Sequence, residues 1–296
     1  MADSDRNRAF AAARREALAA GSRIQGEAAA VILRHLREAE RRIAAILAAA
    51  PSDYRVWQLT QLQRQVRQAL AAIEPAAAAA LGTAADRAQA AGQAVVDLPL
   101  AAGGVDIKAH VVALDTRKLV PVKDFMTARI RDITGEIADR INTELAQVII
   151  GVQSPSDAAA KVAGMVDGGY KRAAGIVRNE VGRAFSVASQ DRQRQAAAVL
   201  PGLQKQWRRS GKVHSRPEHD AIDGQIRDVD KPFDLPNGVR LMHPRDPAGP
   251  IEETINCGCS SIPHMAHWTV ARPLRQPASP EERARNPMKR WIDDAL

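Results

Sequence analysis

The stretch from Lys205 to Cys259 constrains the fold most, because a run so rich in proline, glycine and aspartate cannot form one long helix. Two runs with alternating character, one around Trp207 and one over 225–229, flank Asp223-Gly224. This arrangement is typical of a tight turn between antiparallel strands. We therefore expect a small antiparallel sheet with long loops, which packs on the preceding helix through Trp207 and Phe233.

The chain before this stretch has the pattern of alanine-rich helices. Apolar residues recur there at intervals of three and four, which is the spacing of one helix face. Two such stripes are Ile32, Leu36, Ala39, Ile43 and Ile46, and Met126, Ile130, Ile133, Ile137, Ile141, Leu145 and Val148. With only 3% aromatic residues, few large side chains are available for a globular core. The predicted fold class is mainly α, with long helices, an N-terminal helical arm and a small C-terminal α+β module.

Changes in pattern divide the chain into segments. Alternation over 105–111 predicts a short hairpin or a linker, after a helix that ends at about Ala94. Gly168-Gly169 is expected to end a short helix that starts at Ser154-Pro155. The predicted segments are an alanine-rich helical arm at 1–95, a linker or hairpin at 96–122, long helices at 123–202, the α+β module at 203–265 and an extended proline-rich tail at 266–296.

The tail carries two features of its own. Ser279-Pro280-Glu281-Glu282 has the composition of a capped helix start, so one short helix is expected there. Trp268 and Trp291 are large apolar side chains in an otherwise polar segment. We expect them to anchor the tail in a neighbouring subunit.

The charge and hydropathy of the chain exclude several classes of protein. The net charge of +8 is spread along the helices and the tail, while 205–265 is neutral, so no dedicated DNA-binding face is predicted. The acidic N-terminus lacks the apolar core of a secretory signal, and no stretch approaches the roughly 18 apolar residues of a membrane helix. We expect a protein that folds in a reducing cytoplasm and has no membrane partner.

Both cysteines lie at the end of the turn-rich stretch. Cys257 and Cys259 are one residue apart, which favours free thiols or metal ligands over a disulfide. Together with His219, and with His214, His243 or His264 as a fourth ligand, they offer the nitrogen and sulfur atoms of a tetrahedral zinc site. The spacing is shorter than in ordinary zinc loops, so buried thiols beside a hydrogen-bonded histidine remain the alternative.

The same residues also allow a catalytic interpretation. Cys257 or Cys259 would be the nucleophile, His219 the base and Asp223 the group that orients it. No local nucleophile motif supports this arrangement, and a charge-assisted hydrogen bond between loops is the simpler role for Arg216 and Asp223. We therefore predict that the chain is not an enzyme and has no catalytic residues.

Several residues in this region resemble a known family when they are taken in order. The motifs are Lys205-x-Trp207, Arg216-x-x-His219, Asp223-Gly224, Phe233, a proline cluster at Pro244, Pro247 and Pro250, and Asn256-Cys257-x-Cys259. They resemble the phage Mu F-like head morphogenesis family of minor head proteins, and the resemblance covers roughly 123–262. Gly258 stands between the cysteines, where the family usually has arginine.

The resemblance implies a minor head, or minor capsid, structural protein of a tailed phage or prophage. Such a protein would be associated with the portal vertex, needed for head morphogenesis and present in several copies per virion after assembly in the host cytoplasm. Its implied partners are the portal protein and the major capsid protein, with packaged phage DNA as a further contact. The alternatives are a non-specific DNA-binding protein of the head interior and a metal-dependent Cys/His enzyme.

Overall fold

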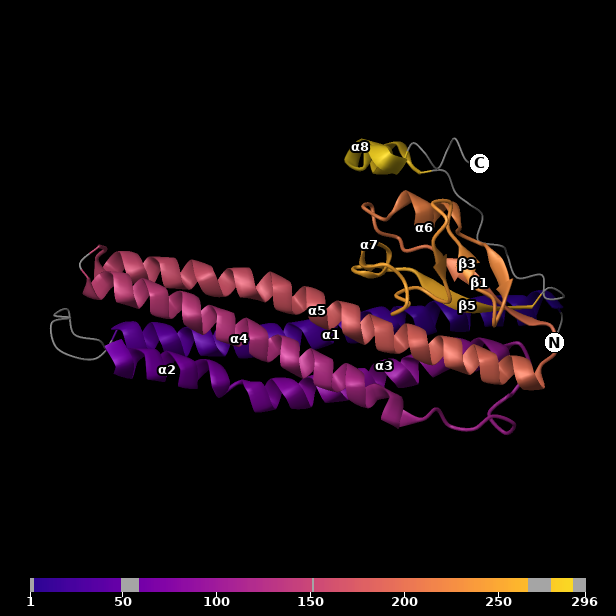
Figure 1. Ribbon diagram of the computed structural model, residues 1–296. Helices are drawn as coiled ribbons and strands as arrows, with labels where there is room; N and C mark the ends of the chain where they lie inside the picture. The colour runs from indigo at the N-terminus through magenta and orange to yellow at the C-terminus, as the bar shows by residue number, and fades with distance from the viewer. Residues whose placement is uncertain (1–2, 49–58, 151, 266–277, 290–296) are drawn as a thin grey trace. The chain divides into compact units, whose positions relative to one another are not determined.

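The computed structural model describes residues 3–48, 59–150, 152–265 and 278–289 (Figure 1). It confirms the predicted fold class, since long helices are followed by a small region of short antiparallel strands. The long helices are α1 (Asp3–Ala48), α2 (Leu59–Ala71), α3 (Glu74–Ala102), α4 (Val120–Ile149) and α5 (Pro155–Val199). None of the helices in the described parts of the chain has the length and hydropathy that a membrane span requires.

The chain forms two compact units, and each is assembled from separate segments. Unit 1 comprises Met1–Gln25, Ala85–Arg117 and Val181–Leu296, and unit 2 comprises Gly26–Ala84 and Lys118–Glu180. The helices α1, α3 and α5 each contribute residues to both units. These boundaries do not coincide with the segments predicted from composition.

Unit 2 is helical, and its core includes most residues of the predicted stripes. Every residue of the stripe from Met126 to Val148 is buried, as are Ile32, Leu36 and Ile43 of α1. Exposed ion pairs flank this core, among them Arg67 of α2 with Asp139 of α4 at 3.5 Å. Because exposed pairs of this kind contribute about 1 kcal/mol at most, burial of the apolar stripes is what holds unit 2 together.

The prediction that Gly168-Gly169 ends a helix is wrong, because α5 continues through both residues. A glycine costs a helix about 1 kcal/mol relative to alanine, so a compensating interaction is needed. A Cβ atom at Gly169 would lie 2.7 Å from Cδ1 of Ile137. The missing side chain therefore lets α5 approach α4 closely, and this packing outweighs the low helix propensity of glycine.

The expected helix end near Ala94 is not observed, and of the two alternatives for 105–111, a hairpin or a linker, the hairpin does not form. The helix α3 runs on to Ala102 with Pro99 inside it. Residues 103–115 then form turns and irregular structure, in which the backbone N–H of Lys108 donates to Asp106 Oδ1 (3.0 Å). Such an Asx-type bond stabilises a turn, and a strand as short as the predicted one is not stable without a paired neighbour.

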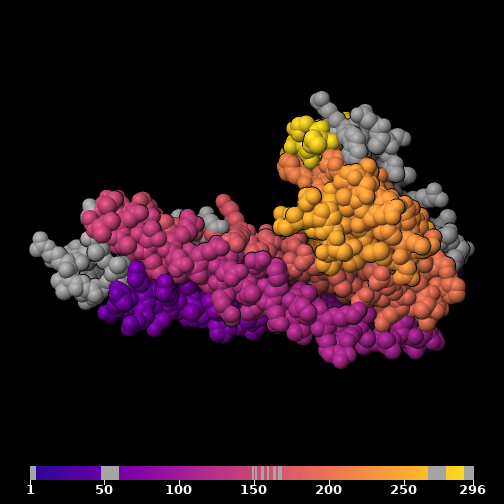
Figure 2. Space-filling model, in the orientation of Figure 1, coloured from indigo at the N-terminus to yellow at the C-terminus, as the bar shows by residue number. Residues whose placement is uncertain are grey.

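Unit 1 contains the C-terminal module together with the first part of α1 and the last parts of α3 and α5. Its main sheet has the strand order β2-β1-β5, formed by β1 (Leu203–Arg208), β2 (Ile226–Asp228) and β5 (Ser260–Met265). Both neighbours are antiparallel to β1, which pairs Gln206 with Ile226 and with Ile262. The short strands β3 (Phe233–Asp234) and β4 (Arg240–Leu241) form a second antiparallel pair. Figure 2 shows residues 203–265 as one compact body.

The module has its own apolar core, built around Trp207 and Phe233. Their rings meet edge to face with centroids 5.2 Å apart. Its other members are Ile222, Leu235, Leu241, Cys257 and Cys259. No residue of α5 is a member of this cluster, so the packing of Trp207 and Phe233 on α5 stays a prediction.

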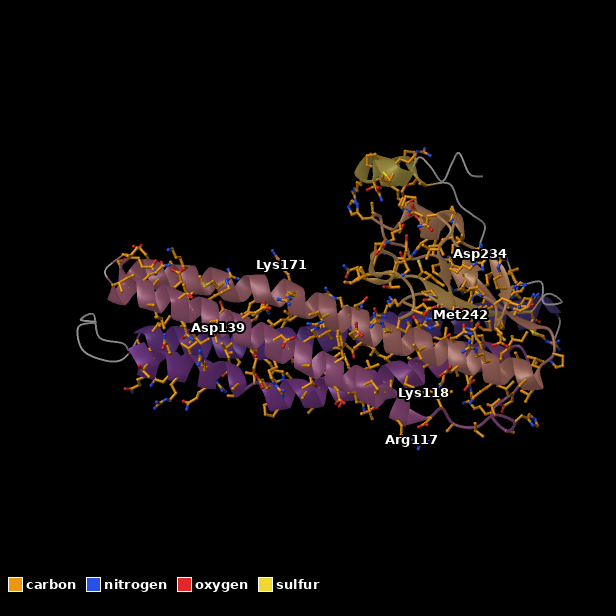
Figure 3. All side chains as sticks on the ribbon, viewed as in Figure 1. Arg117, Lys118, Asp139, Lys171, Asp234 and Met242 are labelled. Atoms are coloured by element: carbon orange, nitrogen blue, oxygen red, sulfur yellow. The ribbon has the colours of Figure 1, made fainter. Side chains whose placement is uncertain are left out.

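Polar bonds join the module to α5. Gln190 Nε2 donates to the carbonyl of Val229 (2.6 Å), and Gln193 Nε2 donates to Ser261 Oγ (3.3 Å). Lys205 Nζ donates both to Gln190 Oε1 (3.2 Å) and to the carbonyl of Met242 (2.7 Å), which is labelled in Figure 3.

The remaining elements are short. They are η1 (Thr116–Leu119), α6 (Pro217–Ala221), α7 (Ile251–Thr254), α8 (Pro280–Arg285) and η2 (Pro287–Lys289). The predicted helix after Ser279 forms as α8, with a complete capping box between Ser279 and Glu282. Trp268 and Trp291, the predicted anchors, lie outside the described residues.

Candidate metal centre

Three buried side chains from distant parts of the module converge on one point. His219 lies on α6, while Cys257 and Cys259 lie in the turn between α7 and β5. Asn256 begins this turn with a positive φ of 54°, a conformation that asparagine adopts more readily than most residues. The ring of His219 contacts the edge of Trp207, with centroids 5.2 Å apart. The core of the module thus helps to orient the ring of His219.

Both sulfur atoms lie close to the same ring nitrogen. The distance to His219 Nδ1 is 3.5 Å from Cys257 Sγ and 3.7 Å from Cys259 Sγ. All three atoms lie within 4.8 Å of one another. At most 3% of each residue is exposed, so the group is removed from bulk water. Two thiols and an imidazole are the ligand types that zinc prefers.

The other nitrogen of the histidine faces a buried carboxylate. His219 Nε2 lies 2.9 Å from Glu253 Oε2, although the ring N–H is not aligned on this oxygen as in a good hydrogen bond. Glu253 is itself held, because its Oε1 accepts a bond from Asn237 Nδ2 (2.8 Å). A carboxylate beside Nε2 favours the tautomer with the proton there, which leaves the lone pair of Nδ1 toward the sulfurs.

The two thiols share their protons unequally. The hydrogen bond between them lowers the pKa of Cys257 well below the usual thiol range and raises the pKa of Cys259 well above it. His219 and the nearby cation Arg245 also lower the pKa of Cys257. The backbone N–H of Ser210 bonds the sulfur of Cys259. The site is therefore suited to hold at least one thiolate.

The predicted fourth ligands do not join this group. His214 is exposed, and Nδ1 of His243 lies 3.0 Å from the carbonyl of Pro244. His264 lies within β5, opposite Gln204 of β1. Among the described residues, only His219, Cys257 and Cys259 form a group with metal-binding geometry.

The other predicted signature residues have separate positions. Asp223 accepts from the backbone N–H of Arg209 (2.9 Å), and burial raises its pKa. Arg216 donates to the carbonyl of Ile255 (2.8 Å), and its Nε lies 3.8 Å from Glu253. Arg216 and Asp223 therefore stabilise different loops, and the residue that faces His219 is Glu253 rather than Asp223.

The remaining two signature residues shape the module. Gly224 has a positive φ of 83°, and its N–H donates to the carbonyl of Trp207 (2.9 Å). Phe233 is fully buried against Trp207.

A buried ion pair between Asp220, which follows His219 in the sequence, and Lys289 holds the segment 278–289. Lys289 Nζ lies 2.7 Å from Asp220 Oδ2 and donates to Ser215 Oγ (2.7 Å). Both Lys289 and Asp220 have side chains that are 0% exposed. Residues 278–289 are thus docked on the module, whereas the sequence predicted an extended tail.

Sequence reasoning did not identify Glu253, Arg245 or Lys289 as part of this region. Arg245 is buried with a positive φ of 61°, and its guanidinium lies 3.5 Å from the carbonyl of Cys259. Glu253 follows another glutamate, Glu252, and nothing in the sequence distinguishes the two. Lys289 lies in a proline-rich segment that is typical of a solvated tail, so no local pattern indicated its burial.

The burial of Lys205 can be tested by the pH dependence of protein stability. Burial, with a contribution from Arg194, lowers the pKa of Lys205 to about 8, against the opposing effect of Asp230 and Asp246. Between pH 8 and the ordinary lysine value of about 10.4, the unfolded chain binds more protons at this residue than the folded chain. Its contribution to stability is therefore expected to rise with pH over this window.

We expect the free energy of unfolding of the native chain, minus that of Lys205→Met, to increase between pH 7.5 and pH 10. Urea unfolding of both proteins at a series of pH values measures this difference. A difference that stays constant or falls over the window contradicts the burial of a titrating Lys205.

Comparison with known proteins finds a family that is similar to this region. Residues 139–262 match the family described as Phage Mu protein F like protein. Over these residues the chain is similar to the phage Mu F-like family. The match confirms the resemblance stated from the sequence, and it indicates a phage head morphogenesis protein. The Mu F-like region includes the end of α4, all of α5 and the module as far as β5, so it contains His219, Cys257 and Cys259.

A curated relative of the chain bears the name of an enzyme. It is the NAD(+)--arginine ADP-ribosyltransferase EFV of Enterococcus faecalis, which is 27% identical over 137 residues. The match covers 46% of this chain and 28% of the relative. It contradicts the prediction that the chain is not an enzyme. No solved structure matches the chain significantly.

Proposed function

We propose that the protein is a minor head protein of a tailed phage or prophage, associated with the portal vertex and needed for head morphogenesis. The observation that carries this proposal is the match of residues 139–262 to the Mu F-like family. The partners are then the portal protein and the major capsid protein, and the location is the portal region of the phage head.

The charges of the helices favour a protein partner over DNA. Arg41 and Arg42 of α1 both pair with Glu38. Arg67 pairs with Asp139 in the same way. Each phosphate contact would have to compete with these carboxylates, and the module itself is neutral in charge.

Purified particles of the phage or induced prophage that carries the gene provide the test. Quantitative mass spectrometry is expected to find the chain in full heads at far fewer copies than the major capsid protein. The chain should also copurify with coexpressed portal protein after nuclease treatment. Absence from the particles, together with no binding to portal protein, would reject the proposal. Binding that nuclease removes would show that DNA is the partner instead.

The named relative introduces a second candidate function, transfer of ADP-ribose from NAD⁺ to arginine. In this reaction the bond between nicotinamide and the ribose C1′ atom breaks, a bond from a guanidino nitrogen to C1′ forms, and nicotinamide and a proton leave. The full chain would be incubated with NAD⁺ and agmatine, an arginine analogue. Nicotinamide release that depends on agmatine would establish the transfer, and an unchanged NAD⁺ concentration would exclude it for this acceptor.

A further inference from the structure

We propose that His219, Cys257 and Cys259 bind one zinc ion, which ties α6 to the start of β5 and holds the module together. The inference goes beyond the proposed function, because it concerns how the Mu F-like module folds rather than what the head contains. It rests on the convergence of His219 with two cysteines that lie 38 and 40 residues further along the sequence.

The distances between the ligand atoms agree with a tetrahedral ion. Bonds of about 2.3 Å to sulfur and about 2.0–2.1 Å to nitrogen, at tetrahedral angles, separate a sulfur from a nitrogen by about 3.5–3.6 Å. The observed separations from His219 Nδ1 are 3.5 Å to Cys257 Sγ and 3.7 Å to Cys259 Sγ. The side chains would therefore need little movement to reach the ion.

Hydrogen bonds can pair the two thiols with each other and one thiol with Nδ1 of His219. Such a chain of bonds does not require the second sulfur to approach the same nitrogen. Here both sulfurs approach this one nitrogen, at 3.5 and 3.7 Å, and all three groups are buried. An ion that prefers sulfur ligands requires this arrangement, in which two cysteine sulfurs and a histidine nitrogen surround one point.

The groups around the three ligands fit a metal site as well. Glu253 lies behind the histidine, 2.9 Å from Nε2, in the position of the carboxylate that orients many metal-bound histidines. Gly258 keeps the turn close to Ser210, since a Cβ there would lie 2.8 Å from Ser210 Cβ. This closeness lets the N–H of Ser210 bond the sulfur of Cys259. Two thiolates would also balance the charge of Zn²⁺, so the ion and its three ligands together would carry no net charge in the buried site.

The fourth ligand is expected to be water, because no fourth His, Cys, Asp or Glu side chain among the described residues joins the group. His214, which the sequence offered as a ligand, is exposed and serves as the matched control. A small module with few aromatic residues gains from such an ion, since the binding free energy adds to the folding free energy.

The test uses the full chain without a histidine tag, purified from cells supplied with zinc. Elemental analysis is expected to give one zinc per chain in the native protein and in His214→Ala. It should give none in Cys257→Ser or Cys259→Ser. Removal of zinc by a chelator should lower the Tm of the native protein by roughly 5–10 °C, and added zinc should restore it.

A second measurement does not depend on the folding of the variants. Cobalt(II) added to the metal-free native chain should produce the near-ultraviolet band of thiolate-to-cobalt charge transfer, with saturation at one ion per chain. No zinc in the native protein and no such band with cobalt would overturn the proposal. Zinc that is retained in both cysteine variants but lost in His214→Ala would also overturn it, because the ion would then bind at a surface histidine only.

Discussion

Replacing Trp207 by alanine is expected to lower the local stability of the module by about 3–5 kcal/mol. Trp207 is 0% exposed and touches both Phe233 and His219 through edge-to-face ring contacts. Removal of the indole would leave a cavity at the centre of the module core, and the strands around it can close this space only in part. Hydrogen exchange of peptides from β1 and β5 measures the free energy of local opening.

Two matched variants separate this effect from a general loss of an aromatic ring. Trp207→Phe should cost far less than Trp207→Ala, because the buried indole N–H has no acceptor among the described residues and phenylalanine keeps a ring there. Phe125→Ala removes an exposed ring from α4 and is expected to change stability by about 1 kcal/mol or less. A cost for Trp207→Ala as small as that for Phe125→Ala would contradict the assignment of Trp207 as the centre of the core.

Replacing Arg192 by alanine should destabilise unit 1 by about 3–5 kcal/mol, because it leaves a buried carboxylate without its cation. The guanidinium of Arg192 bonds both oxygens of Asp97, at 2.7 and 2.8 Å, and also the carbonyl of Val112 (3.1 Å). It thereby joins α5 to α3 and to the turns that follow α3. Urea unfolding followed by circular dichroism measures the loss.

A neighbouring pair on the same helix provides the control. Arg194 lies two residues further along α5 and pairs with Asp230 at 3.0 Å, with both side chains exposed. Arg194→Ala is expected to cost about 1 kcal/mol at most. In the double variant Arg192→Met, Asp97→Leu, most of the stability should return, since no charge is left buried. Equal losses in Arg192→Ala and Arg194→Ala would show that burial does not strengthen the Asp97 pair.

The helices could be predicted from sequence because a stripe such as Met126 to Val148 encodes the buried face directly. The errors occurred where packing between distant residues outweighs a local preference. Gly169 is a poor helix residue by itself, and only its contact with Ile137 shows why α5 continues. Residues 105–111 alternate as a strand would, but alternation does not supply a pairing partner.

Of the candidate site, only the residues of rare types could be predicted from the sequence. Cysteine and histidine are few in this chain, so Cys257, Cys259 and His219 were prominent from composition. Glu253 and Lys289 belong to residue types that are common on surfaces, and their burial depends on the tertiary fold. The sequence offered Asp223 as the partner of His219, whereas α7 brings Glu253 to within 2.9 Å of Nε2 of this histidine.

The discontinuous build of unit 1 affects any attempt to isolate the Mu F-like region. The family match starts at residue 139, so a recombinant fragment cut at its boundaries would lack the parts of α1 and α3 that belong to this unit. Phe185 is 3% exposed in the whole chain, where it packs against Gly21 and its carbonyl lies close to Gly92. In the fragment this ring would face water. During biosynthesis, α1 likewise leaves the ribosome long before residues 181–296, so unit 1 can close only when almost the whole chain has been made.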